Sequence, residues 1–99
     1  MFTHVVLFWL KTDSSADAKR QLLDDARRLL STIEMVTFLD VGVPAGTDRP
    51  VVDNTYDVCL VTAFADAAGH DAYQVHPAHL EFVARNKPNF EKIRVFDSI

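Results

Sequence analysis

Apolar positions recur at two spacings along this chain, and the change between them predicts its secondary structure. Phe2 to Leu10 is almost continuously apolar, rich in β-branched and aromatic residues, and followed by turn formers, which predicts a strand. Beyond Ser14, apolar residues recur three and four positions apart as far as Ile33, while charged residues such as Asp25 fill the other positions. This pattern predicts an amphipathic helix of about five turns.

The rest of the chain predicts two strands, a helix with a break, and a final strand. Glycine and proline place a long loop between the two strands, and Asp66 is a natural N-cap for the following helix. Pro77 ends that helix, because proline lacks an amide donor and disfavours the helical conformation in His76. We expect strands over 35–43, 55–64 and 90–96, and helical segments over 66–75 and 78–86.

The order of these elements, βαββαβ, predicts one domain over residues 1–99 with the α+β, ferredoxin-like fold. In this fold a four-stranded antiparallel sheet carries its helices on one face. Both faces of the first and third strands are apolar here, so the helices can cover only half of the apolar surface. We therefore expect a symmetric homodimer, a dimeric α+β barrel, with the two sheets packed face to face. The expected interface residues are Val5, Leu7, Trp9, Cys59 and Val61.

Composition and charge exclude several other classes of protein. The 99 residues carry a net charge of −4 and no basic run, which argues against a nucleic-acid partner. The longest apolar run, Val5 to Leu10, is far shorter than the roughly 20 residues that cross a membrane, and no signal peptide is indicated. Cys59 is the only cysteine, which excludes an internal disulfide and favours a reducing, cytoplasmic location.

Four short stretches resemble one known family when taken together. They are His4-Val5-Val6-Leu7-Phe8, Tyr56-Asp57-Val58, Tyr73-Gln74-Val75-His76-Pro77-Ala78-His79 and Val95-Phe96-Asp97. Their order and spacing resemble the stress-responsive A/B-barrel (Dabb) proteins of the dimeric α+β barrel superfamily. The resemblance covers almost the whole chain and implies the same fold that the apolar pattern predicts.

One branch of that family, the plant polyketide cyclases of the olivetolic acid cyclase type, closes a linear polyketide by an aldol reaction without a cofactor. The resemblance implies His79 as the catalytic base, Tyr73 beside it, and His4 as a supporting pocket histidine. The chain departs from that branch at other pocket positions, where a tryptophan, a histidine and a tyrosine are replaced. The residues found there are Phe90, Val58 and Ala26.

The residues themselves support acid–base chemistry in an apolar pocket. A histidine there loses solvation of its charged form, so it stays neutral and can remove a proton beside a carbonyl group. Tyr73 could then donate its hydroxyl to the enolate oxygen. The structural alternative is that His79 and Tyr73 only join helix to sheet. The expected pocket, which holds a small hydrophobic, carbonyl-rich ligand and no cofactor, is lined by His4, Val6, Phe8, Val58, Tyr73, His79 and Phe90.

Two other functions and a metal site remain as alternatives. The chain could be a non-catalytic stress-associated protein that acts as an oligomer or holds a ligand, or a cofactor-independent monooxygenase or haem-degrading relative. His4, His76 and His79 have the chemistry of zinc ligands, but Pro77 breaks their helical spacing, so no metal is expected. We expect His70 to be solvated, His76 to be structural, and the loop over 44–54 to be a solvated connection.

Overall fold

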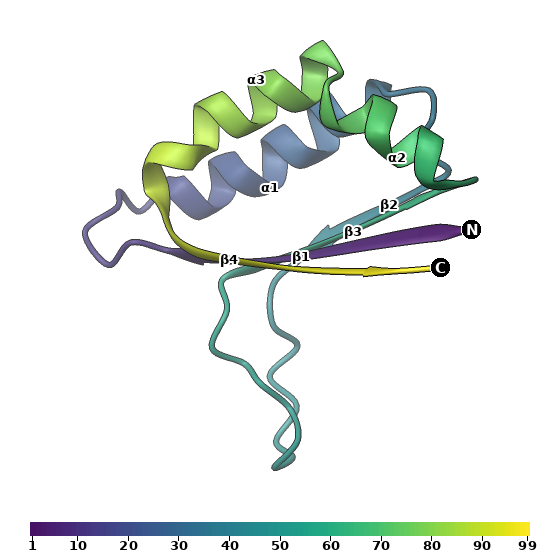
Figure 1. Cartoon of the computed structure of the whole chain (residues 1–99). Coiled ribbons are helices and arrows are strands. Elements are labelled where there is room, and N and C mark those ends of the chain that lie inside the picture. Colours follow the sequence, from purple (N-terminus) through teal and green to yellow (C-terminus); the bar gives the residue numbers. More distant parts are fainter.

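A computed structural model describes all 99 residues. The chain forms four strands, three α-helices and two short 3₁₀ turns (Figure 1). In chain order they are β1 (Phe2–Leu10), α1 (Ala18–Leu29), η1 (Leu30–Thr32), β2 (Phe38–Gly42), β3 (Val58–Phe64), α2 (Ala67–Gln74), α3 (Pro77–Asn86), η2 (Lys87–Asn89) and β4 (Phe90–Ser98).

The strands form a single antiparallel sheet in the order β2-β3-β1-β4. All three helices lie on one face of this sheet, and the other face carries none (Figure 1). This is the ferredoxin-like arrangement that the sequence predicted. No helix is both long enough and apolar enough to cross a membrane.

Several element boundaries differ from the sequence-based expectation. The first helix ends at Leu29 and tightens into η1 instead of continuing to Ile33. Strand β3 begins three residues later than expected, because the Thr55 amide donates to the Asp53 carboxylate in a local turn instead of joining the sheet. Strand β4 extends two residues further, since Ser98 still pairs with Thr3 of β1.

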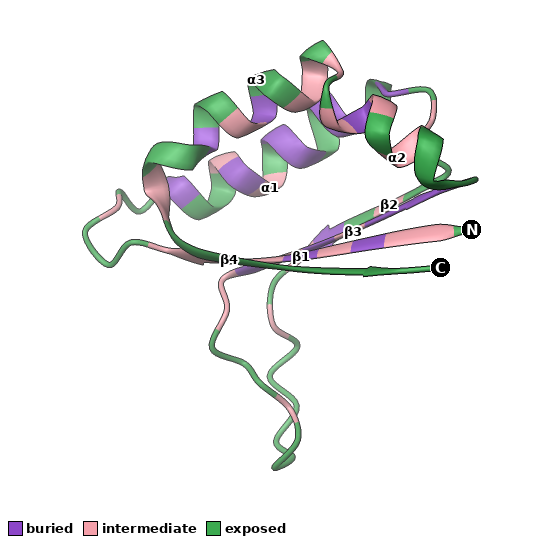
Figure 2. Ribbon diagram, viewed as in Figure 1, coloured by how far each residue is buried: buried purple, intermediate pink, exposed green.

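The hydrophobic core lies between the helices and the sheet (Figure 2). Its helical side comes from Leu22, Ala26 and Leu29, which share one face of α1 as their spacing predicted. Its sheet side comes from alternate residues of β1 and β3, such as Val6 and Leu60. The alternation assigns Val5 and Leu7 of β1 to the opposite face.

Asp25 is a charged residue inside the helix layer, although the sequence pattern placed it on the polar face of α1. Its side chain is 4% exposed and accepts hydrogen bonds from Arg85 Nε at 2.8 Å and Asn86 Nδ2 at 3.1 Å. Arg28 completes the cluster at 3.2 Å. Burial alone would raise the pKa of Asp25, but these three partners outweigh it and hold the pKa below its ordinary value. The carboxylate thus joins α1 to α3.

The sheet face without helices presents the five residues expected at an interface. Val5, Leu7 and Trp9 of β1 alternate with buried residues, as do Cys59 and Val61 of β3, and all five are half-buried in the single chain. The two outer strands are more polar on this face than the two central ones. They carry Asp40 opposite Val61, Arg94 opposite Leu7, and Lys92 opposite Trp9.

The connection between β2 and β3 projects from this same face as a long arm (Figure 1). It therefore lies on the side of the sheet away from the helices, not over a pocket beneath them. The arm carries two exposed valines, Val43 at 50% and Val51 at 79%. Hydrogen bonds such as Asn54 Nδ2 to the Thr47 carbonyl join its two limbs.

Candidate functional site

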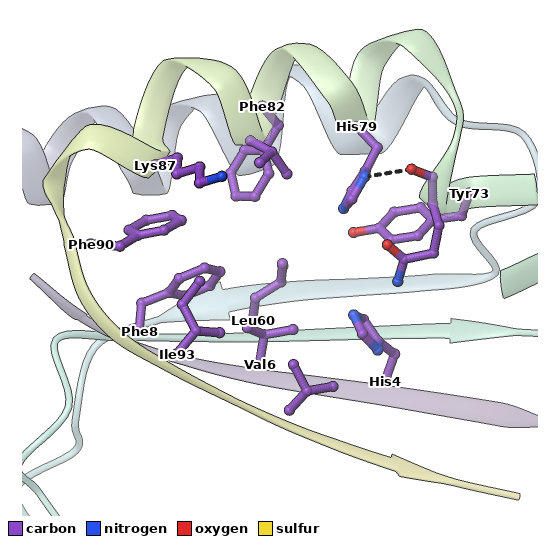
Figure 3. A pocket seen from close by; sticks show the side chains of 13 residues that line it. His4, Val6, Phe8, Leu60, Tyr73, His79, Phe82, Lys87, Phe90 and Ile93 are labelled. Atoms are coloured by element: carbon purple, nitrogen blue, oxygen red, sulfur yellow. Dashed lines mark hydrogen bonds between the residues drawn. The ribbon is translucent and has the colours of Figure 1, made fainter. Parts of the chain in front are cut away.

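A cavity of about 250 Å³ lies between the helix layer and the sheet (Figure 3). Two histidines and a tyrosine occupy one end, and aromatic side chains with Lys87 occupy the other. Its volume is just below the roughly 300–1,000 Å³ of sites for drug-sized ligands, so it suits a small molecule. The lining residues are His4, Val6, Phe8, Leu60, Tyr73, Gln74, His79, Phe82, Val83, Lys87, Phe90, Ile93 and Val95.

His79 stands in the first turn of α3, which Pro77 begins. Its Nδ1 lies 3.1 Å from the Gln74 carbonyl oxygen. A carbonyl oxygen can only accept, so Nδ1 carries the hydrogen and Nε2 keeps a lone pair. Burial lowers the pKa of His79 below its ordinary value of 6.5, which keeps the ring neutral at pH 7. The imidazole is therefore oriented and available as a base.

Tyr73 lies beside His79, with ring centroids 4.5 Å apart. The residue is fully buried, and its hydroxyl is the one buried side-chain polar atom without a hydrogen-bond partner. Such groups are rare in folded proteins, because an unsatisfied hydroxyl costs free energy. Burial also raises the pKa of Tyr73 far above its ordinary value and outweighs the nearby Thr62 hydroxyl, which lowers it without forming a well-aligned hydrogen bond, so the Tyr73 hydroxyl keeps its hydrogen. Tyr73 lines the cavity, so an acceptor atom of a ligand that reaches the hydroxyl would satisfy this donor.

Replacing Tyr73 by phenylalanine should therefore leave the folded protein at least as stable as the wild type. The variant removes an unpaired buried hydroxyl and keeps the ring. We expect a change in the free energy of unfolding between zero and about 1 kcal/mol in favour of the variant. Urea unfolding checks this, and a loss of more than about 1 kcal/mol would show that the hydroxyl has a partner within the fold.

His4 lies at the same end of the cavity, on β1, and is 5% exposed. Its Nδ1 is 2.5 Å from the Asp97 carboxylate of β4, the residue directly opposite in the sheet register. The ring of His70, on α2, packs against the His4 ring with centroids 4.7 Å apart. It also stacks on the Phe2 ring with centroids 4.4 Å apart. The expectation that His70 is solvated is wrong, since its side chain is only 12% exposed.

Most of the expected pocket residues line the cavity, but Val58 does not. Val58 is completely buried in the core beside Phe8, its partner in the sheet, whereas the cavity lies over β1 and β4. Sequence reasoning missed Lys87 and Val95, among others. The antiparallel register would have found Val95, because it places this residue opposite Val6.

The three histidines weighed as metal ligands do not form one group. His76 accepts a hydrogen bond from the Ala78 amide and so caps α3, which agrees with its expected structural role. Its Nε2 lies 3.7 Å from Glu34, away from the residues that line the cavity. The side chains whose possible metal-ligand atoms do lie close together are those of His4, His70 and Asp97.

Fold and site together define a small ferredoxin-like α+β protein with a pocket under its second and third helices. The model of the stress responsive A/B barrel domain (Dabb) family matches residues 2–99, so the chain belongs to this family. A Dabb family protein from Mesorhizobium loti is 32% identical, with a TM-score of 0.79 over 99% of this chain and 94% of the other. A search of curated protein sequences finds no match.

Two further solved structures share the fold at lower identity. A dimeric ferredoxin-like protein of unknown function from Thermobifida fusca is 22% identical, with a TM-score of 0.82 over 98% of this chain and 88% of the other. A hydroxynitrile lyase from Passiflora edulis is 23% identical, with a TM-score of 0.81 over 99% of this chain and 91% of the other.

Proposed function

We propose that this protein binds a small hydrophobic carbonyl compound and performs cofactor-free acid–base chemistry on it, with His79 as the base and Tyr73 as the hydrogen-bond donor. The observation that carries the proposal is the Tyr73 hydroxyl, fully buried, unpartnered and at the cavity end that His79 shares. The cavity's apolar walls suit a hydrophobic ligand, and the hydroxyl suits a carbonyl oxygen.

The geometry supports proton abstraction beside a carbonyl group. His79 Nε2 takes a proton from the carbon next to the carbonyl, and the electron pair moves onto the oxygen as an enolate. Tyr73 donates a hydrogen bond to that oxygen, where the negative charge develops. In an aldol cyclisation, the enolate carbon then bonds to a second carbonyl carbon of the same molecule, and the His79 imidazolium returns its proton to the new alkoxide.

Exchange of deuterium into a simple ketone tests the first step without knowledge of the natural substrate. Acetophenone is incubated in D₂O with the protein, and loss of its methyl proton signal is followed by NMR. General-base catalysis typically contributes 10² to 10⁴-fold, so His79→Gln should lower the protein-dependent rate by about 100-fold or more. His76→Asn, which keeps a capping side chain on α3, should exchange at the wild-type rate.

The pH profile of this exchange gives a second readout of the same base. Only the neutral imidazole accepts a proton, so the rate should fall as pH drops through the pKa of His79. Because burial places that pKa below 6.5, more than half of the imidazole is neutral at pH 6.5, so the rate there should exceed half of its plateau value. Equal exchange in wild type and His79→Gln at every pH would remove His79 from the mechanism.

The second copy of this chain is the partner that the uncovered sheet face fits best, which makes the protein a homodimer. The central strands present an apolar face, and the arm with its exposed Val43 and Val51 projects beyond it. The Thermobifida fusca protein of the same fold is dimeric, which supports this assembly. A cytoplasmic location stays a prediction from the single cysteine.

A non-catalytic ligand-binding protein is the second candidate. The mostly apolar cavity supports it equally, since binding needs the Tyr73 donor but not the His79 base. Saturable binding of acetophenone, lost in Tyr73→Phe but without deuterium exchange, would establish this alternative. The monooxygenase and haem-degrading alternatives remain predictions, and the absorbance of the protein after incubation with haem tests the second.

A further inference from the structure

Three side chains with metal-binding atoms meet beyond the Tyr73 end of the cavity. They are His4 of β1, His70 of α2 and Asp97 of β4, and one ligand atom from each lies within 4.8 Å of the other two. Three separate elements supply them, so the tertiary fold and not a sequence motif brings them together. The proposed aldol chemistry does not use His70 or Asp97.

Two imidazoles and one carboxylate form a donor set that divalent transition metals accept. Catalytic zinc sites have three protein ligands of this kind and leave one position for water or another ligand. Zinc-bound nitrogen and oxygen atoms are about 2.0 to 2.2 Å from the metal, which places tetrahedral ligand atoms roughly 3.3 to 3.6 Å from one another. His4 and Asp97 are already 2.5 Å apart, so a cation requires them to separate slightly and His70 to approach.

The surroundings permit that adjustment. His4 is held in the buried sheet, whereas Asp97 lies near the end of β4 with 39% of its side chain exposed. Asp97 can therefore move, and it leaves the cluster open to solvent. Register places Asp97 beside His4 on the helix side of the sheet, so a partner on the opposite face would not cover it.

Two neighbouring side chains orient the His70 ring. Phe2 stacks on it at 4.4 Å, and the Gln74 side-chain amide lies 2.9 Å from Nε2. Metal-bound histidines donate their second ring N–H to an acceptor, so on metal binding at Nδ1 the Gln74 amide would turn its oxygen toward Nε2 in place of the nitrogen that faces it here. Burial lowers the pKa of His70, and a neutral imidazole is the form that binds a metal. Asp71, on the same helix, also faces this histidine at 3.8 Å.

We propose that His4, His70 and Asp97 form a binding site for one divalent transition-metal cation of the zinc type. The site lies next to the cavity, because His4 is a member of both. It shares His4 with the cavity but takes no ligand from Tyr73 or His79, the donor and the base of the proposed function.

Calorimetric titration with Zn²⁺ tests the proposal on the tag-free, chelator-treated protein. We expect one ion per chain, an increased melting temperature, and a Co²⁺ absorption spectrum of a protein-bound ion. His70→Gln and Asp97→Asn should each weaken binding by about tenfold or more, as loss of a ligand or its support typically does. Both variants retain similar shape, and circular dichroism verifies that they fold.

His76→Asn is the matched control, because His76 and the exposed Glu34 form a second pair to which zinc could bind. This variant should bind Zn²⁺ as the wild type does. Absence of binding at millimolar Zn²⁺ would overturn the proposal. So would binding that His76→Asn abolishes and His70→Gln leaves intact. The ketone exchange experiment depends on His79 and is measured separately, so either result leaves the test of the proposed function in place.

Discussion

Val5→Glu is expected to convert the protein from a dimer to a monomer. Val5 lies in the middle of the uncovered sheet face, paired with Val61 of β3 on one side and Phe96 of β4 on the other. In a symmetric dimer the substitution places two carboxylates in one apolar interface. An unpaired buried charge costs several kcal/mol, and symmetry applies that cost twice.

Analytical ultracentrifugation over a range of protein concentrations measures this change. The matched control is Leu80→Glu, because Leu80 lies on α3, in the helix layer away from the uncovered face, and is 54% exposed. It should remain dimeric. A wild-type protein that is monomeric at micromolar concentration would contradict the homodimer, as would a Val5→Glu dimer of unchanged affinity.

Asp25→Ala is expected to lower the free energy of unfolding by about 3 kcal/mol, the lower end of the range for breaking a buried ion pair. The loss leaves Asn86, which is 1% exposed, without its carboxylate partner. Arg28 and Arg85 are half exposed and can regain water, which limits the cost. Urea unfolding measures the difference. Asp24→Ala, at an exposed position beside Arg27, should change stability by less than about 0.5 kcal/mol.

The lowered pKa of Asp25 predicts how the stability difference between wild type and Asp25→Ala depends on pH. The folded-state pKa of Asp25 is lower than its ordinary value of 3.8, so its contribution is fully present above the unfolded pKa. It is lost as pH falls below 3.8 and through the lowered folded pKa. The gap between wild type and Asp25→Ala should therefore be constant near neutrality and shrink in acid. A gap that widens below pH 4 would contradict this account.

Local patterns were sufficient to predict the layers of this fold. Alternation along β1 separated Val6 from Val5, and helical spacing placed Leu22 and Ala26 on the core side of α1. The Pro77 break was predicted because proline's lack of a donor is a local property. The sequence pattern did not predict that Asp25 is buried. Asp25 is buried only because α3 supplies its partners Arg85 and Asn86, which lie about 60 residues away in the sequence.

Some residues of the candidate site were predicted from the sequence and others were not. His79, Tyr73 and His4 were found through motif and alternation, and the structure places all three at one end of the cavity. His70 and Asp97 were missed, because contact between α2 and the edge strand β4 depends on how the helix crosses the sheet. Strand register, once known, accounts for the pairing of His4 with Asp97 but not for His70.

The carbonyl carbon of a bound ketone reports most directly on whether the buried Tyr73 hydroxyl donates to a ligand in the cavity. Acetophenone labelled with ¹³C at the carbonyl is titrated with the protein and observed by NMR. If the buried Tyr73 hydroxyl donates to the carbonyl oxygen, the signal moves downfield on binding in wild type and stays near its free position in Tyr73→Phe. A signal that moves equally in both proteins, or in neither, would contradict the account.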